Sequence, residues 1–184
     1  MGVTGEVPNL QLVKNRTDLI LKVALAGLTA ALCVVVAGTL EQTVIEKGDT
    51  APKFTVPTDQ GKTVTRSDFG GKVLVLNFWA TWCGPCIQEL PSLDQFARTY
   101  SGKGVTVVAV SVDRNEKRYK DLLDRVKPAF LTWRDPEANL PARYGTFMYP
   151  ETYVIDASGK VLYKEAAARD WMDPTFLNYF QSLL

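Results

Sequence analysis

The sequence contains no histidine, and only 3 of its 184 residues are cysteine. The absence of histidine excludes histidine general bases, Ser-His and Cys-His nucleophile pairs and every metal site that uses imidazole. Neither sign of charge is in excess, with 21 basic against 20 acidic residues. The positive field that gives general affinity for nucleic acid is therefore missing, and any chemistry must come from other residue types.

One long run without charge lies near the N-terminus. Residues 23–40 read VALAGLTAALCVVVAGTL, and as a helix at about 1.5 Å per residue this run spans roughly 27 Å, close to the hydrocarbon core of a bilayer. The basic residues Lys14, Arg16 and Lys22 precede the run, and the acidic residues Glu41 and Glu46 follow it. By the positive-inside rule, the N-terminus is then cytoplasmic and the rest of the chain is exported.

We therefore predict a cytoplasmic segment over 1–22, a single-pass anchor in the cytoplasmic membrane over 23–40, a linker over 41–48 and a periplasmic domain over 49–184. A cleaved signal peptide is the competing interpretation, because Val35-Val36-Ala37 resembles a cleavage site with small residues. The length of the apolar run favours an uncleaved anchor. A lipoprotein is disfavoured because Leu32 precedes Cys33 where a small residue is needed.

Beyond the linker, patterns typical of strands and helices alternate. A turn-rich stretch at 58–61 separates two short strands and predicts a hairpin, and the run VLVLNFW at 73–79 predicts a strand covered on both faces. Apolar residues at spacings of three and four predict helices after it. The predicted strands are 54–56, 63–65, 73–79, 105–112, 152–155 and 161–163, and the predicted helices begin near 84, 119 and 174. This order implies a layered α/β domain.

The chemistry is concentrated in Cys83-Gly84-Pro85-Cys86, which follows the buried strand and opens a helix. Two cysteines three apart on a helical turn are near enough to form a disulfide. Cys83 would lie at the helix N-terminus, where free amides and the helix dipole favour a thiolate, so we predict that Cys83 is the attacking sulfur. Cys86, one turn further, would be the resolving thiol, and Pro85 presets the helical turn.

Three other interpretations of this pair remain. A zinc half-site lacks further ligands, because the third cysteine is in the apolar run and histidine is absent. A purely structural disulfide closes a ring too small to stabilise a fold strongly, about 2 kcal/mol against nearly 5 kcal/mol for a hundred-residue loop. Peroxidase chemistry would require Pro-x-x-x-Thr-x-x-Cys. This chain instead has Leu76 at the proline position and Ala80 at the threonine position.

The motif stretch FWATWCGPC at 78–86 resembles the active site of thioredoxins. Cys86-x-x-Glu89-x-Pro91 and the early Gly48-Asp49-x-Ala51-Pro52-x-Phe54 resemble the membrane-anchored TlpA/ResA-like branch. The likeness covers residues 48–184. It implies a thioredoxin fold with an N-terminal hairpin extension and a central insertion, preceded by one transmembrane helix.

The resemblance also implies a cis-proline against the active site, at Tyr149-Pro150. Pro150-Glu151-Thr152 is similar to thioredoxin-like proteins of cytochrome c maturation, although Thr146 and Met148 replace the usual Val and Gly.

A second departure concerns proton transfer. Asn77 stands where thioredoxins carry a buried aspartate. Glu89 lies on the same helical face as Cys86 and is the expected replacement as proton acceptor, with its pKa raised if it is half buried; a solvated helix glutamate is the alternative.

We expect Trp82 on an exposed rim where a partner docks, together with Gly84, Pro85, Tyr149 and Pro150. The leading hypothesis is a membrane-tethered thiol-disulfide oxidoreductase that reduces protein disulfides, apocytochrome c among them. It uses no cofactor besides the Cys83–Cys86 disulfide, binds no metal and receives electrons from a membrane carrier of the DsbD/CcdA kind. An oxidant or isomerase would use the same residues, and a docking module with inert cysteines is the third hypothesis.

Overall fold

The computed structural model describes residues 10–40 and 44–184. The chain divides into two compact units, Met1–Gln42 and Thr43–Leu184. Helix α1 (Leu10–Leu40) belongs to the first unit. Within α1, the stretch Arg16–Val36 has a mean hydropathy of 2.5 and is long and apolar enough to cross a membrane, a property that signal sequences share. The helix begins inside the segment predicted to be cytoplasmic, and its candidate span starts earlier than residue 23.

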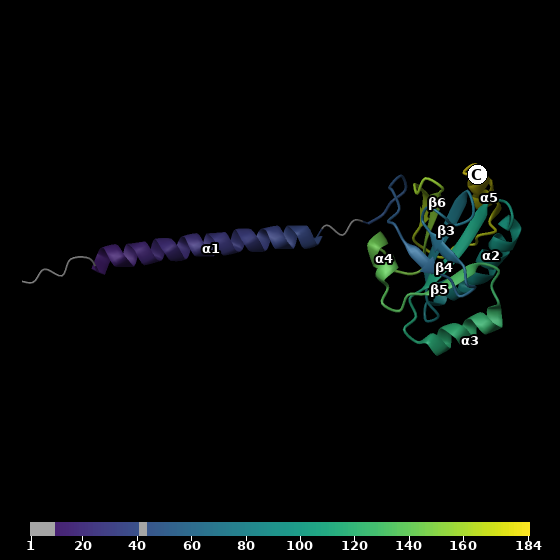
Figure 1. Ribbon diagram of the computed structural model, residues 1–184, viewed down its shortest axis with the longest axis horizontal. Helices are drawn as coiled ribbons and strands as arrows, with labels where there is room; N and C mark the ends of the chain where they lie inside the picture. The colour runs from purple at the N-terminus through teal and green to yellow at the C-terminus, as the bar shows by residue number, and fades with distance from the viewer. Residues whose placement is uncertain (1–9, 41–43) are drawn as a thin grey trace, which may run out of the picture. The chain divides into compact units, whose positions relative to one another are not determined.

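The second unit is an α/β domain (Figure 1). In chain order its elements are β1 (Thr55–Pro57), β2 (Thr63–Thr65), β3 (Val73–Trp79), α2 (Gly84–Tyr100), β4 (Val105–Ser111), α3 (Glu116–Val126), β5 (Leu131–Arg134), α4 (Asn139–Tyr144), β6 (Glu151–Asp156), β7 (Val161–Glu165) and α5 (Pro174–Gln181).

The central sheet has the strand order β5-β4-β3-β6-β7. Strands β3, β4 and β5 run parallel, whereas β6 is antiparallel to both β3 and β7. Strands β1 and β2 form a separate antiparallel pair, the predicted N-terminal hairpin. Every residue of β3 is buried, as expected for a central strand with both faces covered.

Alternate residues of β3 enter two different cores. Val73, Val75 and Trp79 pack with α2, α3 and α5, around Leu93, Phe96 and Phe180. Their neighbours Leu74, Leu76 and Phe78 pack on the other face with α4 and the β1–β2 hairpin. Figure 1 shows α2 and α5 on one side of the sheet and α4 on the other. Since side chains alternate along a strand, Asn77 belongs to the face that α2 covers.

The structure differs from the sequence predictions at two elements and at the linker. Strand β5 and helix α4 were not predicted; they lie between β4 and Pro150, where the resemblance placed a central insertion. Pro91 lies inside α2, which continues to Tyr100.

The linker predicted over 41–48 is too long at its C-terminal end. Residues 41–43 lie outside the described residues, but Ile45 is buried and its amide donates to the carbonyl of Tyr144, while the Gly48 amide donates to Val161. Glu46 forms an ion pair with Lys164. These contacts attach the chain to the domain before residue 49.

Candidate active site

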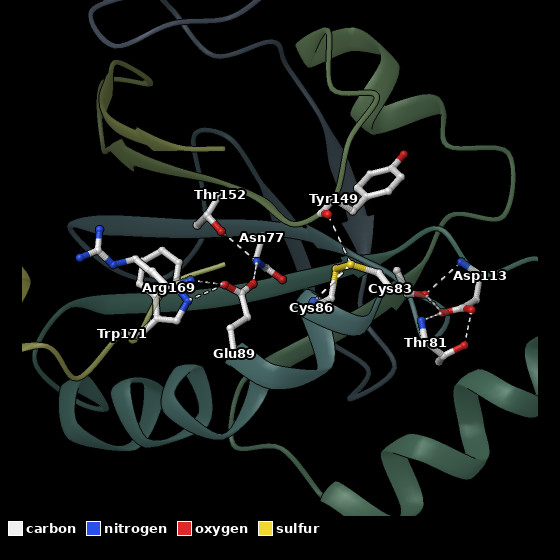
Figure 2. The surroundings of a disulfide bond; sticks show 11 residues. Asn77, Thr81, Cys83, Cys86, Glu89, Asp113, Tyr149, Thr152, Arg169 and Trp171 are labelled. Carbon is white, nitrogen blue, oxygen red and sulfur yellow. Dashed lines mark hydrogen bonds between the residues drawn. A yellow bond between two sulfur atoms is a disulfide. The ribbon is translucent and has the colours of Figure 1, made fainter. Parts of the chain in front are cut away.

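Cys83 and Cys86 form a disulfide at the first turn of α2 (Figure 2). Cys83 is the N-cap of this helix, and its Sγ accepts a hydrogen bond of 3.2 Å from the Cys86 amide. Gly84 and Pro85 are exposed, and Pro85 occupies the first turn, where its missing N–H leaves no donor unpaired. Cys86 is completely buried, whereas Cys83 retains 6% exposure. An incoming sulfur therefore reaches Cys83 before Cys86.

The loop that precedes β6 closes over Cys83. The Tyr149–Pro150 peptide bond is cis, as the resemblance implied, and Pro150 is buried. The carbonyl oxygen of Tyr149 lies 3.4 Å from Cys83 Sγ. In the disulfide form this sulfur has no proton, so a hydrogen bond at this contact requires the reduced thiol. The Tyr149 ring packs edge-on against Trp82, with 6.0 Å between the ring centroids.

Glu89 lies on the Cys86 side of the disulfide (Figure 2) and is buried, with 3% exposure. Its Oε1 accepts a 2.9 Å hydrogen bond from Asn77 Nδ2, and its Oε2 accepts from Trp171 Nε1 at 3.2 Å and from the Arg169 amide at 3.3 Å. Burial raises the pKa of Glu89 above its ordinary value, and the three donors oppose that rise only in part. Glu89 is thus a buried carboxyl rather than a solvated helix glutamate.

The segment that donates to Glu89 is fixed by Arg169. Its Nη1 lies 2.7 Å from Glu165 Oε2 and 2.6 Å from the Tyr163 hydroxyl, and its guanidinium lies 3.9 Å from the centroid of the Phe176 ring. An ion pair combined with ring stacking holds the side chain in one position. The Arg169 amide and the neighbouring Trp171 indole are therefore directed at the carboxylate by the β7–α5 connection.

A buried carboxylate supports the other side of the motif. Asp113, 1% exposed, follows β4 and accepts hydrogen bonds from the Thr81 amide at 2.8 Å and the Thr81 hydroxyl at 2.6 Å. The Ser111 hydroxyl donates to the same carboxylate at 2.6 Å. Figure 2 shows this group beside Cys83, on the side away from Glu89. Asp113 thus fixes the turn between β3 and α2 that carries Trp82 and Cys83.

Two grooves adjoin the site. One of about 460 Å³ brings solvent to the Glu89 side and is lined by Gln88, Glu89, Pro91, Ser92, Ala168, Arg169 and Asp170. The other, of about 440 Å³, passes Trp82 and Tyr149 and includes Arg114, Arg118 and Glu137. The two grooves therefore open at different residues of the site, one at Glu89 and the other at Trp82 and Tyr149.

The structure brings the predicted residues together around one disulfide. Cys83, Cys86, Glu89, Trp82, Tyr149 and Pro150 all lie at it, with Gly84 and Pro85 between the two cysteines. Four further residues that are not among the predicted site residues also lie there: Asp113, Thr152, Arg169 and Trp171. Of these, only Asp113 had a usable signal, because it follows a buried strand parallel to the one that carries the motif, and such strand ends lie side by side.

This fold and this site together define a thiol-disulfide oxidoreductase of the thioredoxin type. The sequence model of the Redoxin family matches residues 46–180, and the chain belongs to this family. A thiol-disulfide oxidoreductase ResA from Bacillus thuringiensis subsp. konkukian is 34% identical over 137 residues, which cover 71% of this chain and 79% of the relative. The thioredoxin-like protein YneN of Bacillus subtilis is 36% identical over 120 residues, 64% of this chain and 69% of YneN.

A solved structure from Chlorobium tepidum, assigned as the thiol:disulfide interchange protein DsbE, superposes with a TM-score of 0.67 at 36% identity. The superposed region covers 75% of this chain and 97% of the Chlorobium tepidum chain. Both the sequence relatives and this structure place the chain in the TlpA/ResA-like part of the thioredoxin superfamily.

Proposed function

We propose that the protein is an extracytoplasmic reductase of protein disulfides, in which the Cys-Gly-Pro-Cys dithiol carries the electrons and no other cofactor or metal takes part. The observation that carries the proposal is the placement of the pair: Cys83 caps α2 at the surface end, whereas Cys86 is completely buried on the side of the disulfide where the buried Glu89 lies. A sulfur at a helix N-terminus is favoured as an anion, so Cys83 is the nucleophile.

The reaction proceeds in two exchanges. The Cys83 thiolate attacks one sulfur of the substrate disulfide, which forms a mixed disulfide and releases the other substrate sulfur as a thiolate. Cys86 then loses its proton to Glu89 and attacks Cys83, which frees the second substrate thiolate. The substrate gains two electrons, and the product is the Cys83–Cys86 disulfide seen in the structure. Glu89 passes its proton to solvent through the adjoining groove.

An exposed apolar rim supports a protein substrate. Among residues 44–184, the three most exposed large apolar side chains are Met148 at 75%, Phe147 at 64% and Trp82 at 62%. All three belong to the two loops that meet at Cys83, since Tyr149 of the second loop contacts its sulfur. Exposed aromatic groups around a nucleophile form contact surface for a partner. Gly84, Pro85 and the Tyr149–Pro150 backbone complete the substrate site.

The partners and the location are part of this proposal. α1 holds a candidate membrane span near the N-terminus, and basic residues before it favour export of the domain. Apocytochrome c is the substrate class that the likeness to cytochrome c maturation proteins suggests. A membrane carrier of the DsbD/CcdA kind would return electrons to the disulfide, which the anchor keeps near the bilayer.

Titration of the Cys83–Cys86 pair in a dithiothreitol or glutathione redox buffer tests the direction of transfer. Gly84-Pro85 places no charge between the cysteines, so we expect a potential near or below that of thioredoxin, about −270 mV. A potential above about −180 mV would replace the reductase with an oxidant or isomerase. Cysteines that stay oxidised over the whole buffer range would favour the redox-inert docking module.

A further inference from the structure

Among residues 44–184, the nitrogen of the Asn77 side-chain amide has hydrogen-bond partners and the oxygen has none. Asn77 is completely buried, and its Nδ2 donates to Glu89 Oε1 at 2.9 Å and to Thr152 Oγ1 at 2.8 Å. Among residues 44–184, its Oδ1 has no hydrogen-bond partner. A buried acceptor without a donor is destabilising, so its presence in a folded protein needs an explanation, such as a redox role.

The orientation of the amide is fixed by its neighbours. Asn77 and Thr152 are directly opposite in the β3–β6 register, and Glu89 faces the same nitrogen from α2. Turning the amide over would place its oxygen against the carboxylate oxygen of Glu89, which is repulsive when that group is ionised. Figure 2 shows the nitrogen turned toward Glu89 and Thr152 and the oxygen turned toward Cys86.

Cys86, toward which this oxygen is turned, changes its chemistry with redox state. In the disulfide, Cys86 Sγ is bonded to Cys83 and has no proton to donate. Reduction by a partner dithiol breaks the S–S bond and delivers two electrons and two protons, while the partner becomes a disulfide. One proton ends on Cys86, whose side chain is completely buried, and the other ends on Cys83 or, with Cys83 as a thiolate, in solvent. The new S–H group is a donor that needs a buried acceptor.

We propose that Asn77 is a positioning residue with a redox-dependent contact: its Nδ2 holds Glu89 in both states, and its Oδ1 accepts a hydrogen bond from the Cys86 thiol only in the dithiol. This contact stabilises the reduced state relative to the disulfide. It also holds the thiol beside the carboxyl of Glu89. The proposal rests on the exchange between disulfide and dithiol and holds for either direction of electron flow.

The test observes the thiol itself. In a full-length protein with Cys33→Ser and Cys83→Ser, Cys86 is the sole thiol, and its S–H stretching band lies in an infrared region free of other protein bands. We expect this band at lower frequency than that of a free thiol, and we expect Asn77→Leu in the same background to move it back. Thr152→Val is the matched control, because it removes a partner of Nδ2 and leaves Oδ1 in place; its band should stay shifted.

A second measurement uses the intact pair. A net hydrogen bond of about 0.5–1.5 kcal/mol corresponds to a two- to tenfold change in an equilibrium constant. Asn77→Leu should therefore move the equilibrium with dithiothreitol about two- to tenfold toward the disulfide. If this variant does not fold, Asn77→Ser, whose hydroxyl oxygen lies one bond closer to the backbone than Oδ1, takes its place in both experiments.

An unshifted band with Asn77 present would overturn the proposal, and so would a band that Asn77→Leu or Asn77→Ser leaves shifted. A shift of the equilibrium toward the dithiol would also contradict it. The infrared result depends on neither substrate nor potential, so it separates a failure of this proposal from a failure of the proposed reductase.

Discussion

Replacing Glu89 with glutamine separates its proton chemistry from its structural role. Glutamine has the same shape, but it cannot accept the proton of Cys86. The side chain is buried and receives three hydrogen bonds. Its amide oxygen can retain the bonds from Arg169 and Trp171, while Asn77 can turn to accept from its amide nitrogen. We therefore expect the variant to fold.

We expect Glu89→Gln to slow the second exchange strongly, because Glu89 accepts the proton of the buried Cys86 thiol. General acid–base catalysis contributes about 10²–10⁴-fold. Water also reaches the Glu89 side through the adjoining groove, so we expect the lower end, a loss of about 10²-fold in the second exchange. Because burial raises the pKa of Glu89, the wild-type rate should climb with pH until that raised pKa is passed. The Glu89→Gln protein should lack this rise of the rate with pH.

The same substitution changes stability with a definite sign. A carboxyl whose pKa is higher in the folded than in the unfolded protein holds more protons when folded, so stability falls as pH rises from its ordinary pKa through the raised one. Each unit of that rise corresponds to about 1.4 kcal/mol. Glu89→Gln removes this loss, so its stability relative to wild type should improve as pH rises from the ordinary glutamate pKa through the raised one.

The assay is stopped-flow resolution of a mixed disulfide formed on Cys83, followed from about pH 5 to pH 9. Denaturant unfolding over the same range gives the stability. Equal rates and equal pH profiles in the two proteins would refute the assignment of Glu89 as the proton acceptor.

Three further predictions concern residues and segments around this group. Trp171→Phe removes a donor to Glu89 Oε2, so the pKa of Glu89 should rise further and the pH–rate limb should move to higher pH; an unmoved limb would contradict this contact. Asp113→Asn places an N–H against donors from Thr81 and Ser111 and should lower the free energy of unfolding by about 1–3 kcal/mol. If the variant is as stable as wild type in denaturant, the turn does not depend on the carboxylate. A reporter fused after Leu184 should be active only outside the cytoplasm, with the protein retained in membranes after carbonate extraction; a shortened soluble product would establish a cleaved signal peptide instead.

The parts predicted from sequence are those whose pattern is local. VLVLNFW identifies β3 without help from the rest of the chain, and Cys-x-x-Cys at the start of a helix identifies the site. Strand β5 has four residues with one fully buried position, and α4 has six residues with no side-chain cap and an internal proline. Segments this short show too little periodicity to be found.

The site residues that were not predicted escape detection for a different reason, because their contacts join distant parts of the chain. Trp171 and Arg169 reach Glu89 across about eighty positions of sequence, and no local pattern in the β7–α5 connection indicates this contact. Asn77 was recognised as a departure from thioredoxins, but its free oxygen is visible only once the sheet register and α2 are in place. Contacts of this kind depend on topology rather than on composition.

The central claim is that Cys83 attacks and Cys86 resolves, and trapping of mixed disulfides tests it most directly. The Cys86→Ser protein lacks the resolving thiol, so it should retain substrate proteins as mixed disulfides on Cys83, visible as adducts that disappear on reduction. The Cys83→Ser protein should retain none, because Cys86 is completely buried. Equal trapping by the two variants, or none by Cys86→Ser, would contradict the account.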